Sequence, residues 1–254
     1  MPLLNFKQSG QGENLVLIHG LFGSMDNLNM VARTLAKTHH VTSVDVRNHG
    51  DSVQINNMGY SELAQDVITT LDHLSIKDCS ILGHSMGGKI AMQIALEHSK
   101  RVKRLIVADI APVTYPAHHL SIIKGLKSIA LSHVNNRKDA DIQLEKFVHE
   151  AGVRQFLLRN LTKKQGSYQF KCALDYISNC YEQIMQGYQG EQSYLGKTLF
   201  IKGGNSDYIK IEHREIIAKI FPNSTAKIIS GAGHWLHAEK SVAFNKIVST
   251  FLTS

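Results

Sequence analysis

The feature that most constrains the fold is an alternation of short apolar runs with helical patterns through the first 112 residues. Four runs rich in Val and Ile each end in glycine or polar residues, as buried parallel strands do. These runs are Asn14–Gly20, His40–Arg47, Cys79–Ser85 and Arg104–Ile110. Amphipathic spacing predicts helices between them, for example over Ser61–Leu74. Strand alternating with helix predicts an α/β fold with a doubly wound, mostly parallel sheet.

The alternation stops in the middle of the chain. From Val113 to Leu195, apolar, basic and turn residues mix in a pattern that we interpret as helical. The strand signal resumes at Thr198–Gly204, and helix, strand and a last amphipathic helix from Ser241 follow. We therefore expect a core built from residues 1–112 and 196–254, with a helical cap inserted as residues 113–195.

Composition excludes several classes of protein. The net charge is +7, but the lysines and arginines are scattered and no aromatic residues interleave with them, which argues against a nucleic-acid partner. No apolar run approaches the roughly 20 residues of a membrane span, and no signal peptide is recognisable at the amino end. The three cysteines have no metal-ligand spacing. We expect a reduced, cytoplasmic protein, either a monomer or a weak homo-oligomer.

The stretch from Gly83 to Gly87, GHSMG, fits the G-x-S-x-G nucleophile elbow. Its context is the one this motif requires, with an apolar strand before it and a helix after it. The glycines allow the tight turn and the close passage of neighbouring chains. We interpret Ser85 as a nucleophile, the alternative being a residue of a glycine-rich turn.

A serine nucleophile needs a base, and histidine suits this role at neutral pH. His234 lies between the last predicted strand and the last helix, so its loop should share the sheet edge that carries Ser85. In α/β-hydrolases the histidine also comes last in chain order. His237, three residues on, is the local rival, but it should already belong to the helix.

The acid that orients the histidine has more than one candidate. Asp109 ends a strongly apolar strand, where a carboxylate has little reason to be unless a partner holds it. Asp207 follows the next strand, and Asp175 lies inside the insertion as a distant third. A G-x-x-D spacing counted from Gly204 reaches Asp207, whereas counted from Gly203 it falls on Ser206.

Two backbone N–H groups are needed for an oxyanion hole. We expect them from Met86, directly after the nucleophile, and from Leu21, in the loop after the first apolar run. His19, in the same loop, is expected to shape it rather than to react. Neither the paired histidines, His39–His40 and His118–His119, nor any other pattern indicates a metal or cofactor site.

Six motifs together resemble the α/β-hydrolase superfamily, and specifically the small YbfF-type bacterial esterases and related abhydrolase-domain proteins. The motifs, in chain order, are HGLFGSMDN, DVRNHGDS, GHSMGGK, ADIAPV, GGNS and GAGHWLHAEK. The resemblance implies a Ser-His-Asp triad, a helical cap inserted after the sixth strand, and hydrolysis of acyl esters or thioesters. It favours Asp109 over Asp207 as the acid. It makes Arg47, Asn48 and His49 loop-shaping residues near the pocket.

The resulting hypothesis is a cofactor-free serine hydrolase that acts on small-molecule esters or thioesters of small to medium acyl groups. Its positive charge suggests an anionic substrate, with acyl-CoA thioesters as an alternative main activity. A perhydrolase side activity would use the same residues. A hydrolase fold that binds a ligand without turning it over is the alternative outside enzymes.

Overall fold

The computed structural model describes residues 2–254, and its centre is one seven-stranded sheet in the order β1-β3-β2-β4-β5-β8-β9. Every neighbouring pair is parallel except β1 with β3. The strands are β1 (Phe6–Ser9), β2 (Glu13–Ile18), β3 (His39–Val44), β4 (Cys79–His84), β5 (Val102–Ala108), β8 (Lys197–Gly203) and β9 (Ser224–Ile229). The predicted α/β class with a doubly wound, mostly parallel sheet is confirmed.

Side chains of the central strands alternate between two apolar layers, as a sheet covered on both faces requires. Val16 and Ile18 of β2 join the cluster under α2 and α3, whereas Leu15 and Leu17 join the cluster under α1 and α11. The helices around the sheet are α1 (Asn29–Leu35), α2 (Tyr60–His73), α3 (Met86–Glu97), α9 (Arg214–Ile220), α10 (Leu236–Glu239) and α11 (Ser241–Thr253).

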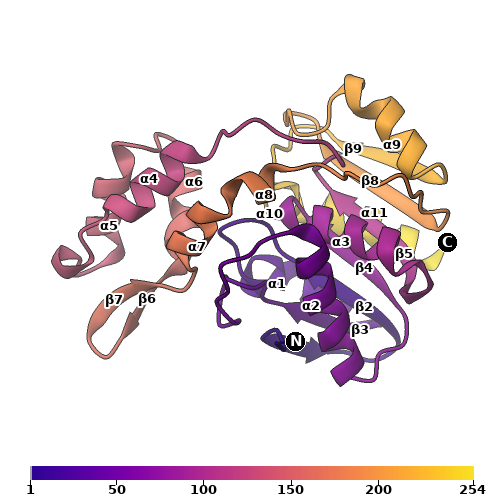
Figure 1. The fold of residues 1–254 in the computed structure, drawn as a ribbon, viewed down its shortest axis with the longest axis horizontal. Helices are drawn as coiled ribbons and strands as arrows, with labels where there is room; N and C mark the ends of the chain where they lie inside the picture. The colour runs from indigo at the N-terminus through magenta and orange to yellow at the C-terminus, as the bar shows by residue number, and fades with distance from the viewer. Residues whose placement is uncertain (1) are drawn as a thin grey trace.

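Much of the chain between β5 and β8, here called the insertion, forms a lobe to one side of the sheet (Figure 1). It contains α4 (Leu120–Ser128), α5 (Arg137–Glu145), α6 (Ala151–Leu157), β6 (Leu161–Lys164), β7 (Ser167–Phe170), α7 (Leu174–Asn179) and α8 (Tyr181–Met185). Short 3-10 turns are η1 (Met25–Leu28), η2 (Ser99–Arg101), η3 (Leu131–His133), η4 (Leu158–Asn160) and η5 (Ile211–His213).

Two details of the insertion correct the sequence-based picture. The insertion was expected after the sixth strand, but it follows the fifth, β5. Residues 2–108 form five strands, β1 to β5, and the insertion comes directly after them. It is also not wholly helical, since β6 and β7 pair as an antiparallel hairpin. The hairpin turn has Gln165 and Gly166 at positive φ, which suits a two-residue turn between strands.

None of the helices formed by residues 2–254 combines the length and the apolar character needed to cross a bilayer.

Candidate active site

Ser85 lies on a sharp turn between β4 and α3, with φ 55° and ψ −122°. This backbone conformation is one that non-glycine residues rarely adopt. The close packing predicted for the flanking glycines is confirmed. A Cβ on Gly83 would lie 2.1 Å from the Gly87 carbonyl oxygen, and a Cβ on Gly87 would lie 2.3 Å from the Ile18 oxygen. Because the chains pass so closely, the turn presents the Ser85 side chain at the edge of the sheet.

Hydrogen bonds connect Ser85, His234 and Asp109 in one path. The distance from Ser85 Oγ to His234 Nε2 is 2.9 Å, and that from His234 Nδ1 to Asp109 Oδ2 is 2.7 Å. The three residues follow β4, β9 and β5. They meet because parallel strands place their carboxyl ends at one edge of the sheet.

Asp109 is fully buried, and its carboxylate has partners other than His234. Oδ1 accepts a hydrogen bond of 2.9 Å from the Gly203 N–H, and Oδ2 also accepts one from the Ser206 hydroxyl. These donors compensate for the loss of water around a buried carboxylate. Ser206 is a site residue that the sequence analysis did not assign, although the spacing counted from Gly203 falls on it.

The alternative residues lie elsewhere. Asp207 is exposed, and the hydrogen-bond partner of His234 Nδ1 is Asp109. Asp175 is also exposed and forms a 2.7 Å ion pair with Lys127. His237 is buried, and its ring centroid lies 4.5 Å from that of His84. The structure therefore brings together Ser85, His234 and Asp109, but not Asp207, Asp175 or His237.

The loop that carries Leu21 is held by two buried histidines. His19 Nε2 accepts the Val46 N–H at 3.0 Å, while His19 Nδ1 donates to the Gly20 carbonyl at 2.8 Å. His49 Nε2 accepts the Phe22 N–H at 3.1 Å. Burial lowers the pKa of His49 to about 3, so its ring is neutral and can accept this bond. Within residues 2–254, no acceptor takes the backbone N–H of Leu21 or of Met86.

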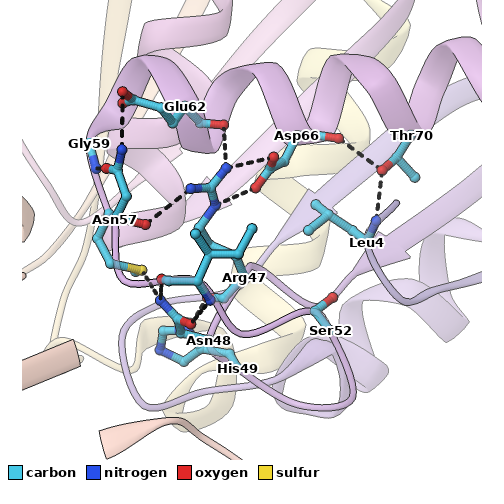
Figure 2. Close-up of polar contacts among 12 residues, drawn as sticks. Leu4, Arg47, Asn48, His49, Ser52, Asn57, Gly59, Glu62, Asp66 and Thr70 are labelled. Atoms are coloured by element: carbon cyan, nitrogen blue, oxygen red, sulfur yellow. Dashed lines mark hydrogen bonds and ion pairs between the residues drawn. The ribbon is translucent and has the colours of Figure 1, made fainter. Parts of the chain in front are cut away.

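Arg47 anchors the neighbouring loop to α2 (Figure 2). Its guanidinium forms a two-pronged ion pair with Asp66, at 2.5 and 2.7 Å, and both side chains are buried. It also donates to the Asn57 carbonyl at 3.1 Å. A planar guanidinium matched to a carboxylate in this way fixes orientation as well as charge. Because His49 lies two residues on, this anchor supports the histidine that holds the Leu21 loop.

A cavity of about 470 Å³ opens above Ser85 and His234. Its walls come from the sheet edge and from the insertion, where α4, α6 and the segment before α6 contribute mostly apolar side chains. Trp235 lines it and lies 5.5 Å from Phe156, measured between ring centroids. The lining residues from the insertion are His118, His119, Ser121, Ile122, Phe147, Val148, Glu150, Val153, Phe156 and Leu157.

Aromatic side chains flank His234. The Tyr208 ring stacks on it, with centroids 3.7 Å apart and planes 15° apart. The Tyr208 hydroxyl lies 2.9 Å from His118 Nε2 and 3.2 Å from His119 Nε2. His119 is half-buried and lines the cavity. Burial lowers its pKa to about 3. Among residues 2–254, no group of three or more candidate ligands could hold a metal ion.

His84 holds the His234 loop through a hydrogen bond to its main chain. Its Nε2 donates to the His234 carbonyl at 2.8 Å, and the two ring centroids are 4.9 Å apart. Burial holds the pKa of His84 well below its usual range, which keeps the ring neutral. Position 84 therefore couples the nucleophile turn to the loop that carries His234.

Residues 13–241 match the alpha/beta hydrolase fold family, so the chain belongs to that family. It is similar to the mouse sn-1-specific diacylglycerol lipase ABHD11, with 39% identity over 246 residues, covering 94% of this chain and 80% of that protein. Identity to Escherichia coli esterase YbfF is 37%, covering 94% and 92% of the two chains. A solved marine microorganism esterase has 38% identity and a TM-score of 0.96, covering 99% of this chain and all of that one. The chain is an α/β-hydrolase of the esterase and lipase type, a carboxylic ester hydrolase.

Proposed function

We propose that this chain hydrolyses esters of small to medium acyl groups through an acyl-enzyme formed on Ser85. The observation that carries the proposal is the hydrogen-bond path from Ser85 Oγ through His234 to Asp109, with distances of 2.9 and 2.7 Å. Both distances lie in the range needed for proton transfer by a positioned base.

In the first half of the reaction, Ser85 Oγ attacks the acyl carbon while its proton passes to His234 Nε2. Asp109 accepts the Nδ1–H and so fixes the tautomer and stabilises the imidazolium. His234 then returns the proton to the oxygen of the leaving alcohol, or to the sulfur of a thioester. In the second half, His234 takes a proton from water, the hydroxide attacks the acyl-enzyme, and Ser85 regains its hydrogen as the acid leaves.

Negative charge develops on the carbonyl oxygen during both attacks. The N–H groups of Leu21 and Met86 are proposed to receive it, which is supported by their lack of other acceptors within residues 2–254. Helix α3 begins at Met86, so the positive end of its dipole also lies near the proposed position of this oxygen.

The lining of the large cavity favours neutral ester substrates over acyl-CoA thioesters. Within residues 2–254 the lining carries one carboxylate, Glu150, and neither lysine nor arginine. Binding the phosphates of CoA would call for such cations. The basic residues behind the net charge of +7 therefore do not line this cavity. A neutral ester with an apolar group matches the mostly apolar walls better than an acyl-CoA thioester does.

The experiment that tests this function compares single variants on a neutral activated ester such as p-nitrophenyl acetate. Ser85→Ala should abolish acyl-enzyme formation. Asp109→Asn should lower kcat by about ten-thousandfold, since the histidine tautomer is then wrong. Asp207→Asn is the matched control, and an exposed substitution of this kind should change kcat by no more than about twofold.

Two results would contradict the proposed residue roles. Normal turnover by Ser85→Ala would refute the nucleophile. A large loss in Asp207→Asn together with an active Asp109→Asn would move the acid to the later loop.

A further inference from the structure

Ser85 lies where two spaces of very different size meet. One is the cavity of about 470 Å³ described above. The other, here called the recess, has a volume of about 20 Å³ and lies on the side of Met86. The residues that line both spaces are Leu21, Ser85, His119 and Tyr208, whereas Lys89 and Met185 line the recess alone.

His234 distinguishes the two spaces, because it lines the large cavity and not the recess. In the proposed reaction, His234 must hand its proton to the oxygen of the leaving alcohol. That oxygen, and the group attached to it, must therefore lie on the His234 side of Ser85. The carbonyl oxygen is held by the N–H groups of Leu21 and Met86. The remaining substituent of the ester carbon, the acyl chain, is left with the part of the recess beyond them, toward Lys89 and Met185.

We infer that the acyl chain enters the recess and the alcohol occupies the large cavity, so that the preferred substrates are esters of short acids with bulky apolar alcohols. This inference rests on the proposed function. A volume of about 20 Å³ accommodates a group the size of one water or methyl. The large cavity falls within the size range of sites that hold small organic ligands.

The walls of the recess are fixed by hydrogen bonds to main-chain atoms. Lys89 Nζ donates to the carbonyls of Met185, at 3.1 Å, and Gln186, at 2.6 Å. The Tyr60 hydroxyl donates to the Ile184 carbonyl at 2.6 Å. These bonds hold the C-terminal end of α8 against α2 and α3. The recess therefore resists widening by a longer acyl chain, because widening would break bonds to buried groups.

The test uses two isomeric esters, hexyl acetate and ethyl hexanoate, which have the same atoms and differ only in which side of the ester carries the long chain. Hexyl acetate should have a kcat/KM about tenfold or more above that of ethyl hexanoate, as expected when extra methylenes do not fit a pocket. Equal rates, or a preference for ethyl hexanoate, would overturn the inference. Hydrolysis of neither ester, or hydrolysis that survives in Ser85→Ala, would instead overturn the proposed function.

Two variants locate the selectivity. Met185→Ala should enlarge the recess and raise the rate of ethyl hexanoate relative to ethyl acetate, with a thermal melt to establish that the variant is folded. Phe156→Ala is the matched change in the large cavity. It should alter the ratio of hexyl acetate to ethyl acetate while leaving the ratio of ethyl hexanoate to ethyl acetate unchanged. If Phe156→Ala, and not Met185→Ala, relaxes the acyl preference, the two sides are assigned the wrong way round.

Discussion

Lys89 is a buried amine one helical turn beyond Ser85, and its partners are carbonyl oxygens and not a carboxylate. The Tyr115 ring centroid lies 4.9 Å from its Nζ. Desolvation by burial lowers the pKa of Lys89 from 10.5 to about 7. The side chain therefore fixes the wall of the recess but does so at a cost in stability whenever it is charged.

This cost predicts a pH dependence of stability. Between about pH 7 and 10.5 the unfolded chain keeps the Lys89 proton and the folded chain releases it. Stability contributed by this group must therefore rise with pH through that window. Replacing Lys89 with Met should remove this rise. The free energy of unfolding of the variant, relative to that of the wild type, should therefore be highest below about pH 7.

Urea denaturation at pH values below, within and at the top of the window measures the effect. Lys124→Met, a change at an exposed lysine of α4, is the control and should follow the wild-type curve. Parallel curves for wild type and Lys89→Met would contradict the account of Lys89.

Single residues of the site differ in how far the sequence could assign them. Ser85 and His234 could be proposed from the sequence, because the elbow motif is a local pattern and the order of the two residues along the chain can be read directly. The acid could not be chosen from the residues alone, since the answer depends on which loop reaches His234. Ser206 and Tyr208 act through contacts across the sheet edge, and neither has a motif of its own.

At the scale of elements, the turn from β4 to α3 determines where the Ser85 side chain points. Gly87 and Gly152 each occupy the second position of a helix, in α3 and α6 respectively. A Cβ on Gly87 would lie 2.3 Å from the Ile18 oxygen and 2.4 Å from the His19 oxygen, whereas one on Gly152 meets nothing within 4 Å. The two positions therefore form a matched pair for testing the elbow.

Gly87→Ala should destabilise the fold by about 1–3 kcal/mol, because backbone atoms must move to admit the methyl group. It should also lower kcat by displacing Ser85 from His234. Gly152→Ala should leave kcat unchanged and stabilise the chain by about 0.5–1 kcal/mol through helix propensity. Urea unfolding midpoints and ester turnover measure both effects. Equal stability and turnover in the two variants would argue against close packing as the cause of the elbow geometry.

The elements themselves were predicted where burial leaves a strong pattern. The runs assigned to β2, β3, β4, β5 and β8 match strands within a few residues, because buried parallel strands are mostly apolar. A strand was also expected before the last helix, where β9 lies, although four of the six residues of β9 are exposed. β1 was not predicted, because it is an edge strand with three of its four residues exposed. β6 and β7 were not predicted either, because their short pairing gives little apolar periodicity.

At the scale of the whole molecule, the insertion and the sheet edge together enclose the site. Asn160 of the insertion donates to the Phe22 carbonyl, beside the loop that carries Leu21. Gln183 of α8 accepts the Met58 N–H at 2.9 Å. The presence of an insertion was predictable from the interrupted alternation. The side chains it turns toward the cavity were not, because that depends on how the lobe docks on the sheet. Of two neighbouring apolar residues of α4, for example, Ile122 lines the cavity while Ile123 is buried in the hydrophobic core.

The central claim is that the folded chain joins Ser85 to His234 and so makes one serine hydroxyl a nucleophile. The most direct measurement is labelling of the intact protein with a fluorophosphonate, followed by mass spectrometry of the modified peptide. The account predicts rapid, stoichiometric labelling at Ser85, and a large loss of labelling in His234→Ala. A folded protein whose Ser85 stays unmodified, or whose label lies on another residue, would contradict it.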